Sequence, residues 1–126
     1  MIVLDTSALM AILLREPEAA RCIAAIGADA QLAISAATLA EALIVAARRG
    51  VGDEMGVLLE RLDPDVLPVQ APDARRAADA YAKWGKGLSP ASLNFCDCFA
   101  YAAAKAFACP LLYVGEDFAR TDVASA

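Results

Sequence analysis

The first nine residues, Met1-Ile-Val-Leu-Asp-Thr-Ser-Ala-Leu9, decide the fold class of this chain. A short apolar run over residues 2–4 stops at Asp5, and two hydroxyl residues follow before the sequence turns apolar again. So short a run of large apolar residues predicts a buried strand rather than a helix. In open α/β sheets, ligands bind at the carboxyl ends of the strands. We therefore expect Asp5 to face a crevice, beside the N-terminus of a helix.

Short apolar runs alternate with helical patterns along the remaining sequence, and Gly or Pro residues separate them. This alternation predicts one domain over residues 1–126, an α/β fold of three layers (α/β/α) with a short central parallel sheet. The predicted strands are 2–4, 32–34, 66–69 and 111–114. The predicted helices are 8–14, 17–26, 36–49, 54–62, 71–83 and 95–108, with a turn at 27–31 and a loop at 88–94.

The composition excludes several classes of protein. The chain has no histidine, which rules out a His-based catalytic triad, and its four cysteines form no C-x-x-C pair, so we expect reduced thiols and no zinc site. The net charge of −5 argues against a protein that coats nucleic acid by charge alone. No apolar run reaches membrane-spanning length and no signal-peptide pattern is present, so we expect a cytoplasmic protein without membrane association.

Three carboxylates stand in apolar surroundings without a neighbouring cation. Asp5 lies between two apolar runs, Glu41 is the only charge between residues 30 and 47, and Asp97 is the only charge between residues 90 and 104. Burying an unpaired carboxylate costs several kcal/mol, a large part of a total stability of ~5–15 kcal/mol. Each acid taken alone could be an exposed charge or a helix cap. To account for the pattern, however, this explanation would have to apply to all three acids.

A fourth acidic position follows the last predicted strand, where Glu116 and Asp117 stand as Asp5 does after the first. If the first and last strands are neighbours at the centre of the sheet, their ends open into one crevice, and two helices bring Glu41 and Asp97 to it. Carboxylates without basic partners suit hard divalent cations. The pattern thus predicts a site for Mg²⁺ (or Mn²⁺) that is suited to metal-assisted hydrolysis of a phosphodiester.

The residues that carry these acids resemble the PIN domain, and within it the VapC toxins of bacterial toxin–antitoxin pairs. The matching segments are LDTSAL (4–9), AEALIVAARR (40–49), LNFCDCFAYAAAK (93–105) and LLYVGEDFARTDV (111–123). The resemblance covers essentially the whole chain. It implies that the metal-binding and catalytic acids are Asp5, Glu41, Asp97 and Asp117, with Glu116 as the rival for the fourth place and Ser7 holding an acid or a water. Cys96 departs from the family, where related sequences usually have glycine.

The resemblance also implies an activity and partners. The activity is that of a metal-dependent endoribonuclease, the toxin component of a type II pair, which cuts structured RNA such as tRNA or rRNA. Asp5, Asp97 and Asp117 would bind the metal, and Glu41 would bind or orient the attacking water. The partners are a VapB-type antitoxin that blocks the acidic pocket, and a second copy in a homodimer. The candidate RNA-binding residues are Arg48, Arg49, Lys83, Lys86 and Arg120.

Three other interpretations compete with this one. A haloacid-dehalogenase-type phosphatase needs a second Asp two residues after the first, where this chain has Ser7, and a lysine before the last acids, where it has Val114-Gly115. A PIN nuclease of RNA processing, without a toxin role, shares the same acids. A binding module with an inactive acidic pocket is the non-enzymatic alternative, which the loss of an acid would indicate.

Overall fold

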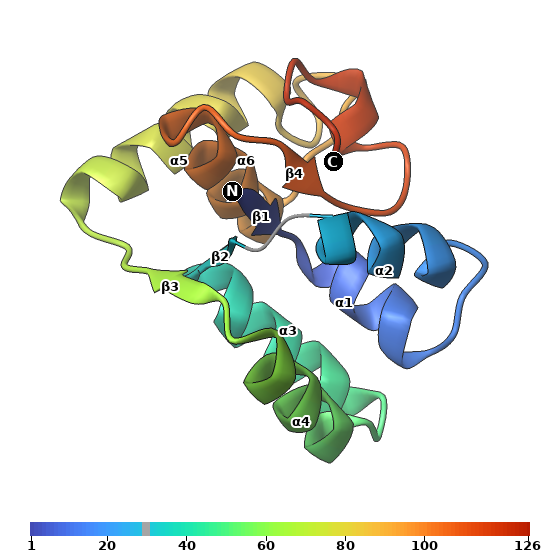
Figure 1. Cartoon of the computed structure of the whole chain (residues 1–126). Coiled ribbons are helices and arrows are strands. Elements are labelled where there is room, and N and C mark those ends of the chain that lie inside the picture. Colours follow the sequence, from blue (N-terminus) through green and yellow to red (C-terminus); the bar gives the residue numbers. More distant parts are fainter. Residues whose placement is uncertain (29–30) are drawn as a thin grey trace.

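The computed structural model describes residues 1–28 and 31–126 (Figure 1). In them, four short strands alternate with six α-helices, and a 3₁₀ turn, η1, follows the last strand. The strands are β1 (Ile2–Leu4), β2 (Leu32–Ser35), β3 (Asp65–Leu67) and β4 (Leu111–Leu112). The helices are α1 (Thr6–Leu13), α2 (Ala19–Ala28), α3 (Ala36–Arg48), α4 (Gly52–Leu62), α5 (Ala71–Trp84) and α6 (Phe95–Ala106), and η1 is Phe118–Arg120.

The four strands form one parallel sheet in the order β3-β2-β1-β4. The predicted pairing of the first and last strands is confirmed, with Val3 opposite Leu111 and Leu4 opposite Leu112. β4, however, lies at the edge of these four strands rather than at the centre. Because all strands are parallel, their carboxyl ends meet along one side of the sheet, where Asp5 follows β1 and α3 follows β2 directly.

Helices cover both faces of the sheet, as the sequence predicts. Side chains alternate between the two faces of a strand, so Val3 packs with α5 and α6, whereas Ile2 and Leu4 pack with α1, α2, α3 and α4. Figure 1 shows α5 and α6 on one side of the sheet and α1 with α2 on the other. The three-layer α/β/α arrangement is confirmed. Within the described ranges, no helix has the length and apolarity needed to cross a membrane.

Several element ends differ from the predicted ones for local reasons. α1 begins at Thr6 instead of Ala8 because the Asp5 side chain caps the helix by accepting from the Ser7 N–H. β3 ends at Leu67, because Pro68 has no N–H for the ladder. α6 stops at Ala106, and Ala108 then adopts a left-handed backbone with φ of +50°.

The predicted turn at 27–31 is wrong at its start, because α2 continues through Gly27 to Ala28. Positions 29 and 30 of that turn lie outside the described residues. α2 starts at Ala19, two residues later than predicted, and α4 starts at Gly52, two residues earlier. β4 covers only the first half of the predicted strand 111–114. None of these shifts moves an acid away from the carboxyl edge of the sheet.

Candidate active site

Asp5 closes β1 and is held by the residues that begin α1. Its Oδ2 accepts hydrogen bonds from the Ser7 backbone N–H at 2.9 Å and from the Ser7 hydroxyl at 2.5 Å. The Ser7 Oγ in turn accepts from the Val114 N–H at 3.0 Å. Ser7 therefore ties Asp5 to the chain just beyond β4. This is the holding role that the family resemblance implies for Ser7, here exerted on an acid.

The other oxygen of Asp5 has no partner. The residue is only 3% exposed, and its Oδ1 is buried without a hydrogen bond to any described residue. Burial raises the pKa of Asp5 to about 6; the bonds from Ser7 oppose this rise, and the negative charge of Glu41 adds to it. Most buried polar atoms in proteins are satisfied. Ser7 donates twice to Oδ2, so among the described residues it is Oδ1 of Asp5 that remains a buried acceptor without a donor.

Glu41 reaches the same region from α3, which Ser35 caps by accepting from the Ala37 N–H at 3.3 Å. The Oε1 of Glu41 accepts a 2.6 Å hydrogen bond from the Thr6 hydroxyl. Thr6 is buried, and it links the first turn of α1 to α3. Thr6 carries no signal in the sequence that points to Glu41, because the two residues are 35 positions apart and only the fold brings them together.

Asp97 lies in the first turn of α6, where it takes part in a capping box. The Asn94 N–H donates to Asp97 Oδ2 and the Asp97 N–H donates to Asn94 Oδ1, both at 2.9 Å. Asp97 therefore does cap the helix, as the alternative interpretation held, but its pKa also shows an unusual environment. Burial raises the pKa of Asp97 to about 7, with further contributions from the charges of Asp5, Glu41 and Asp117.

The fourth acid comes from the segment after β4. Glu116 and Asp117 are both exposed, and Asp117 directly precedes η1. Asp117 contributes to the raised pKa of Asp97, so it lies within electrostatic reach of that acid. This favours Asp117 over Glu116 as the fourth member.

Cys96 adds a thiol to this group. Burial, followed by the charge of Glu41, raises the pKa of Cys96 to about 11. Cys22, Cys96 and Cys98 are free thiols, as predicted from the sequence. A protonated thiol is a weak donor that adds no charge, so the departure from glycine leaves the acidic character of the pocket intact.

Four segments thus bring acids toward one another, and none of the ion pairs among residues 1–28 and 31–126 involves them. The acids do not, however, form a complete set of metal ligands. In this part of the chain no three His, Cys, Asp or Glu side chains stand close enough together to hold a metal ion. The two observations concern different distances, because charges interact over several ångströms, whereas Mg²⁺ needs ligand oxygens about 2.1 Å away.

The five candidate RNA-binding residues do not form one group. Arg48 and Arg49 are exposed at the end of α3, seven residues and about 10 Å of helix beyond Glu41. Lys83 already lies 3.9 Å from Asp122 and above the ring of Trp84.

The other two candidates are near the loop between α5 and α6. Arg120 donates from Nη1 to the Pro90 carbonyl oxygen at 3.3 Å. Lys86 is exposed, and its backbone N–H donates to the Leu93 carbonyl oxygen at 2.9 Å.

Comparisons with known proteins place this chain in a family. The PIN domain family model matches residues 2–124. Ribonuclease VapC30 of Mycobacterium tuberculosis strain H37Rv is 45% identical over 126 residues, which cover 98% of this chain and 96% of the relative. The chain belongs to the VapC ribonucleases of the PIN domain family. A ribonuclease VapC of Mycolicibacterium smegmatis is 42% identical, over 98% of both chains. The predicted family is confirmed.

Solved structures agree with the PIN fold. VapC20 of Mycobacterium tuberculosis, described as a sarcin-ricin loop cleaving toxin, superposes with a TM-score of 0.81 over 100% of this chain and 98% of its own, at 15% identity. FitAcB of Neisseria gonorrhoeae gives a TM-score of 0.68 at 28% identity, over 99% of this chain and 96% of its own. At 15% identity, the likeness to VapC20 concerns the fold alone.

Proposed function

We propose that this VapC-family protein is a metal-dependent endoribonuclease and the toxin half of a type II toxin–antitoxin pair. The observation that carries the proposal is the electrostatic coupling of Asp97 to Asp5, Glu41 and Asp117, four acids that form no ion pair with any of the described residues. The curated relatives named above are called ribonucleases, which agrees with this chemistry. A pocket that raises the pKa of two acids by burial and mutual charge is typical of a functional site.

The residues fit a hard divalent cation, Mg²⁺ or Mn²⁺. The candidate ligands are carboxylate oxygens, which these ions prefer, and the buried Asp5 Oδ1 is an acceptor in need of a positive partner. Asp5, Asp97 and Asp117 would hold the ion. Because no three of the described side chains form a preformed cage, ion binding has to draw them closer. A bound cation supplies Lewis acidity, which lowers the pKa of a water and stabilises charge on the leaving oxygen.

The chain's own residues provide the orientation. Ser7 fixes one oxygen of Asp5 and leaves the other available. Thr6 donates to one oxygen of Glu41, so that the second carboxylate oxygen remains to accept a proton or a hydrogen bond from the attacking water. We propose that Glu41 orients the nucleophile through this second oxygen. Such positioning reduces the entropic part of the barrier.

We propose that the substrate is a structured RNA, such as a tRNA or an rRNA. An acidic protein binds RNA through local cations, and Lys86, Arg120, Arg48 and Arg49 have exposed positions suited to phosphate contacts. We place less weight on Lys83, which is engaged with Asp122 and Trp84.

We further propose a VapB-type antitoxin and a second copy of the chain as protein partners in the cytoplasm. Large apolar side chains are exposed at several places, among them Phe95 at 71% in the first turn of α6 and Ile44 at 60% on α3. A hollow of about 440 Å³ between α5 and α6 is lined mostly by apolar side chains. Exposed apolar surface of this kind favours protein contacts. Toxin–antitoxin complexes are among the similar folds, for example one from Klebsiella pneumoniae.

The test is to map the ends of total cellular RNA after incubation with antitoxin-free protein. We expect one or a few cuts in a tRNA or rRNA loop with Mg²⁺ or Mn²⁺, and none with EDTA. The Asp5→Asn variant is the matched control, because it keeps the side-chain shape and should not cut. Cleavage that persists in EDTA, or in Asp5→Asn, would contradict the site. No cleavage with either ion would instead favour a binding module.

A further inference from the structure

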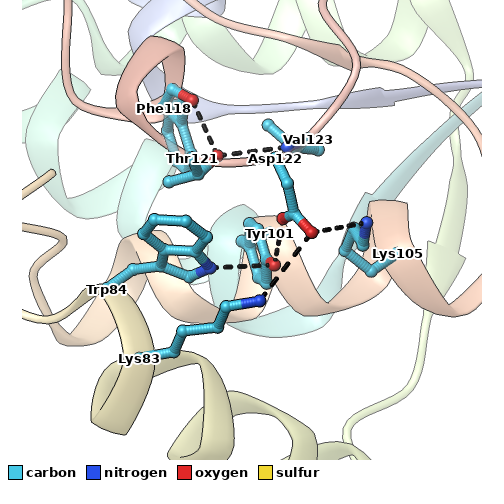
Figure 2. Close-up of polar contacts among 8 residues, drawn as sticks. All are labelled: Lys83, Trp84, Tyr101, Lys105, Phe118, Thr121, Asp122 and Val123. Carbon is cyan, nitrogen blue, oxygen red and sulfur yellow. Dashed lines mark hydrogen bonds and ion pairs between the residues drawn. The ribbon is translucent and has the colours of Figure 1, made fainter.

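A second cluster of polar side chains lies outside the acidic pocket, where three segments meet (Figure 2). The Tyr101 hydroxyl donates to Asp122 Oδ1 at 2.5 Å and accepts from Trp84 Nε1 at 3.0 Å. Lys105 Nζ lies 3.2 Å from Asp122 Oδ2, and Lys83 Nζ lies 3.9 Å from the same oxygen. The cluster thus joins the end of α5, the middle of α6 and the C-terminal segment.

The segment that Asp122 belongs to has little regular structure to hold it. Between β4 and the end of the chain it contains only η1 and one bridge, between Leu111 and Ser125. At its start, Phe118 is buried and its ring packs against Tyr113, with centroids 5.3 Å apart. At its end, the Leu111 N–H donates to the Ala124 carbonyl oxygen at 2.9 Å. In between, the buried Val123 packs into the core cluster that includes α6, and the bonds to Asp122 add polar contacts to the same helix.

Within the cluster, the hydrogen bond from Tyr101 is the interaction best suited to fix the position of Asp122. Tyr101 is 7% exposed, and its hydroxyl is the first cause of the lowered pKa of Asp122. A short bond from a hydroxyl to a carboxylate is stronger and more directional than a neutral one. The two lysines are exposed on the surface, and ion pairs of that kind contribute little.

The cluster also has a fixed relation to the acidic pocket. Tyr101 lies four residues after Asp97 on α6, one helical turn away and on the same face. Asp122 lies five residues after Asp117 on the C-terminal segment. The bond between Tyr101 and Asp122 therefore ties together the two elements that carry Asp97 and Asp117.

We propose that Tyr101 and Asp122 are positioning residues that hold the Asp117 segment against α6 and so set the approach of Asp117 to Asp97. The inference deepens the proposed function and rests on it, because it gives these residues a role in assembling the cation site. Neither residue belongs to the proposed site itself. They act through the backbone that connects them to the acids.

The experiment measures Mn²⁺ binding by calorimetry without RNA, together with amide hydrogen exchange over residues 115–121. In Tyr101→Phe and Asp122→Ala we expect Mn²⁺ to bind about tenfold more weakly, as is usual when a residue supporting a ligand is lost, and exchange over 115–121 to be faster. Asp122→Asn should keep near-wild-type binding, because its amide oxygen still accepts from Tyr101. Tyr101→Phe keeps the buried ring and therefore answers the question even if Asp122→Ala does not fold.

Tyr81→Phe is the matched control, since it removes a hydroxyl that bonds only to the exposed Lys86 carbonyl oxygen at 3.3 Å. Wild-type Mn²⁺ binding in Tyr101→Phe would overturn the inference, and so would an equal loss in Asp122→Asn and Asp122→Ala. Failure of the wild-type protein to bind Mn²⁺ would instead overturn the proposed metal dependence. In that event hydrogen exchange alone decides the inference, and unchanged exchange in Tyr101→Phe would reject it.

Discussion

Asp122 and the acids of the proposed cation site have opposite surroundings. The partner of Asp122, Tyr101, lies one turn of α6 after Asp97. Asp122 is exposed, accepts a hydrogen bond from Tyr101 and lies near two lysines, all of which lower its pKa. Asp5 and Asp97 are placed in or near the interior without a cation, and burial raises their pKa values to about 6 and about 7. The charge of Asp122 has a hydrogen-bond donor and nearby cations. The charges of Asp5 and Asp97 have no cation among the described residues.

The difference distinguishes Asp122, whose charge has partners in the fold, from the acids that we propose bind a cation. With a pKa of about 6 instead of 3.8, keeping Asp5 ionised in the folded protein at neutral pH costs on the order of 3 kcal/mol. A fold stabilised by only ~5–15 kcal/mol does not keep such a cost without a compensating partner. A divalent cation, which we propose for this pocket, reverses the local field that the acids create.

The largest expected difference is between the variants that neutralise Asp97 and Asp122. Asp97→Asn should lower RNA cleavage by about 10³-fold or more, because it removes a proposed ligand of the cation and with it several kcal/mol of transition-state stabilisation. Asp122→Asn, with the same change of charge, should stay within about tenfold of the wild type. Single-turnover cleavage rates check both variants, and equal losses would remove the distinction.

The second effect is a pH dependence of stability in EDTA. The unfolded Asp5 carboxyl titrates near 3.8 and the folded one near 6, so the folded state binds more protons between these values. The unfolding free energy therefore falls as pH rises through this window, by on the order of 3 kcal/mol from Asp5. Asp97 adds a fall of the same sign up to about pH 7.

Urea unfolding between pH 4 and 8 measures this slope. Asp5→Asn should flatten it and should be more stable than the wild type at pH 7.5 in EDTA. Asp122 contributes with the opposite sign, because its lowered pKa gives stability that is lost only as pH falls below its unfolded value of 3.8. A wild-type stability that rises from pH 4 to 7 would contradict the raised pKa values.

A smaller effect concerns the residue that holds Asp5. Ser7→Ala removes a hydroxyl that donates to Asp5 and accepts from the Val114 N–H. We expect a loss of about 2 kcal/mol in unfolding free energy, because both groups lose a partner in a part-buried place. Ser125→Ala is the control, since its hydroxyl makes only a long, exposed bond at 3.4 Å. Equal stability of the two variants would show that Ser7 does not anchor the acid.

The smallest expected effect concerns the ion pair between Lys105 and Asp122. Lys105→Met removes the 3.2 Å ion pair with Asp122 and leaves the Tyr101 bond in place. We expect less than about 1 kcal/mol of destabilisation in urea unfolding, as for other exposed pairs. A larger loss than in Tyr101→Phe would mean that the lysine, and not the tyrosine, holds the C-terminal segment.

The acids were easier to single out in the sequence than the residues that contact them. Asp5, Glu41 and Asp97 stand out because each is a lone charge in an apolar stretch, a property visible without the fold. Thr6 was missed because an ordinary hydroxyl gives no such signal, and its bond to Glu41 exists only once α1 and α3 pack together.

Asp122 was missed for a related reason, since it lies 21 residues from Tyr101 and reads as a common surface acid. The sheet was predicted with the correct strands, and β1 and β4 were correctly paired. The edge position of β4 was not predictable, because strand order depends on how the crossing helices pack. The start of α1 shifted because Asp5 caps the helix, and the end of β3 shifted because Pro68 follows it.

The most direct test of the account is urea unfolding at pH 7.5 with Mn²⁺ and with EDTA, for the wild type and Asp97→Asn. If the unpaired acids form a cation site, Mn²⁺ should raise the unfolding midpoint of the wild type in proportion to the logarithm of its concentration above Kd. Asp97→Asn should show little or no rise. A wild-type midpoint that is the same in Mn²⁺ and EDTA, or an equal rise in both proteins, would contradict the account.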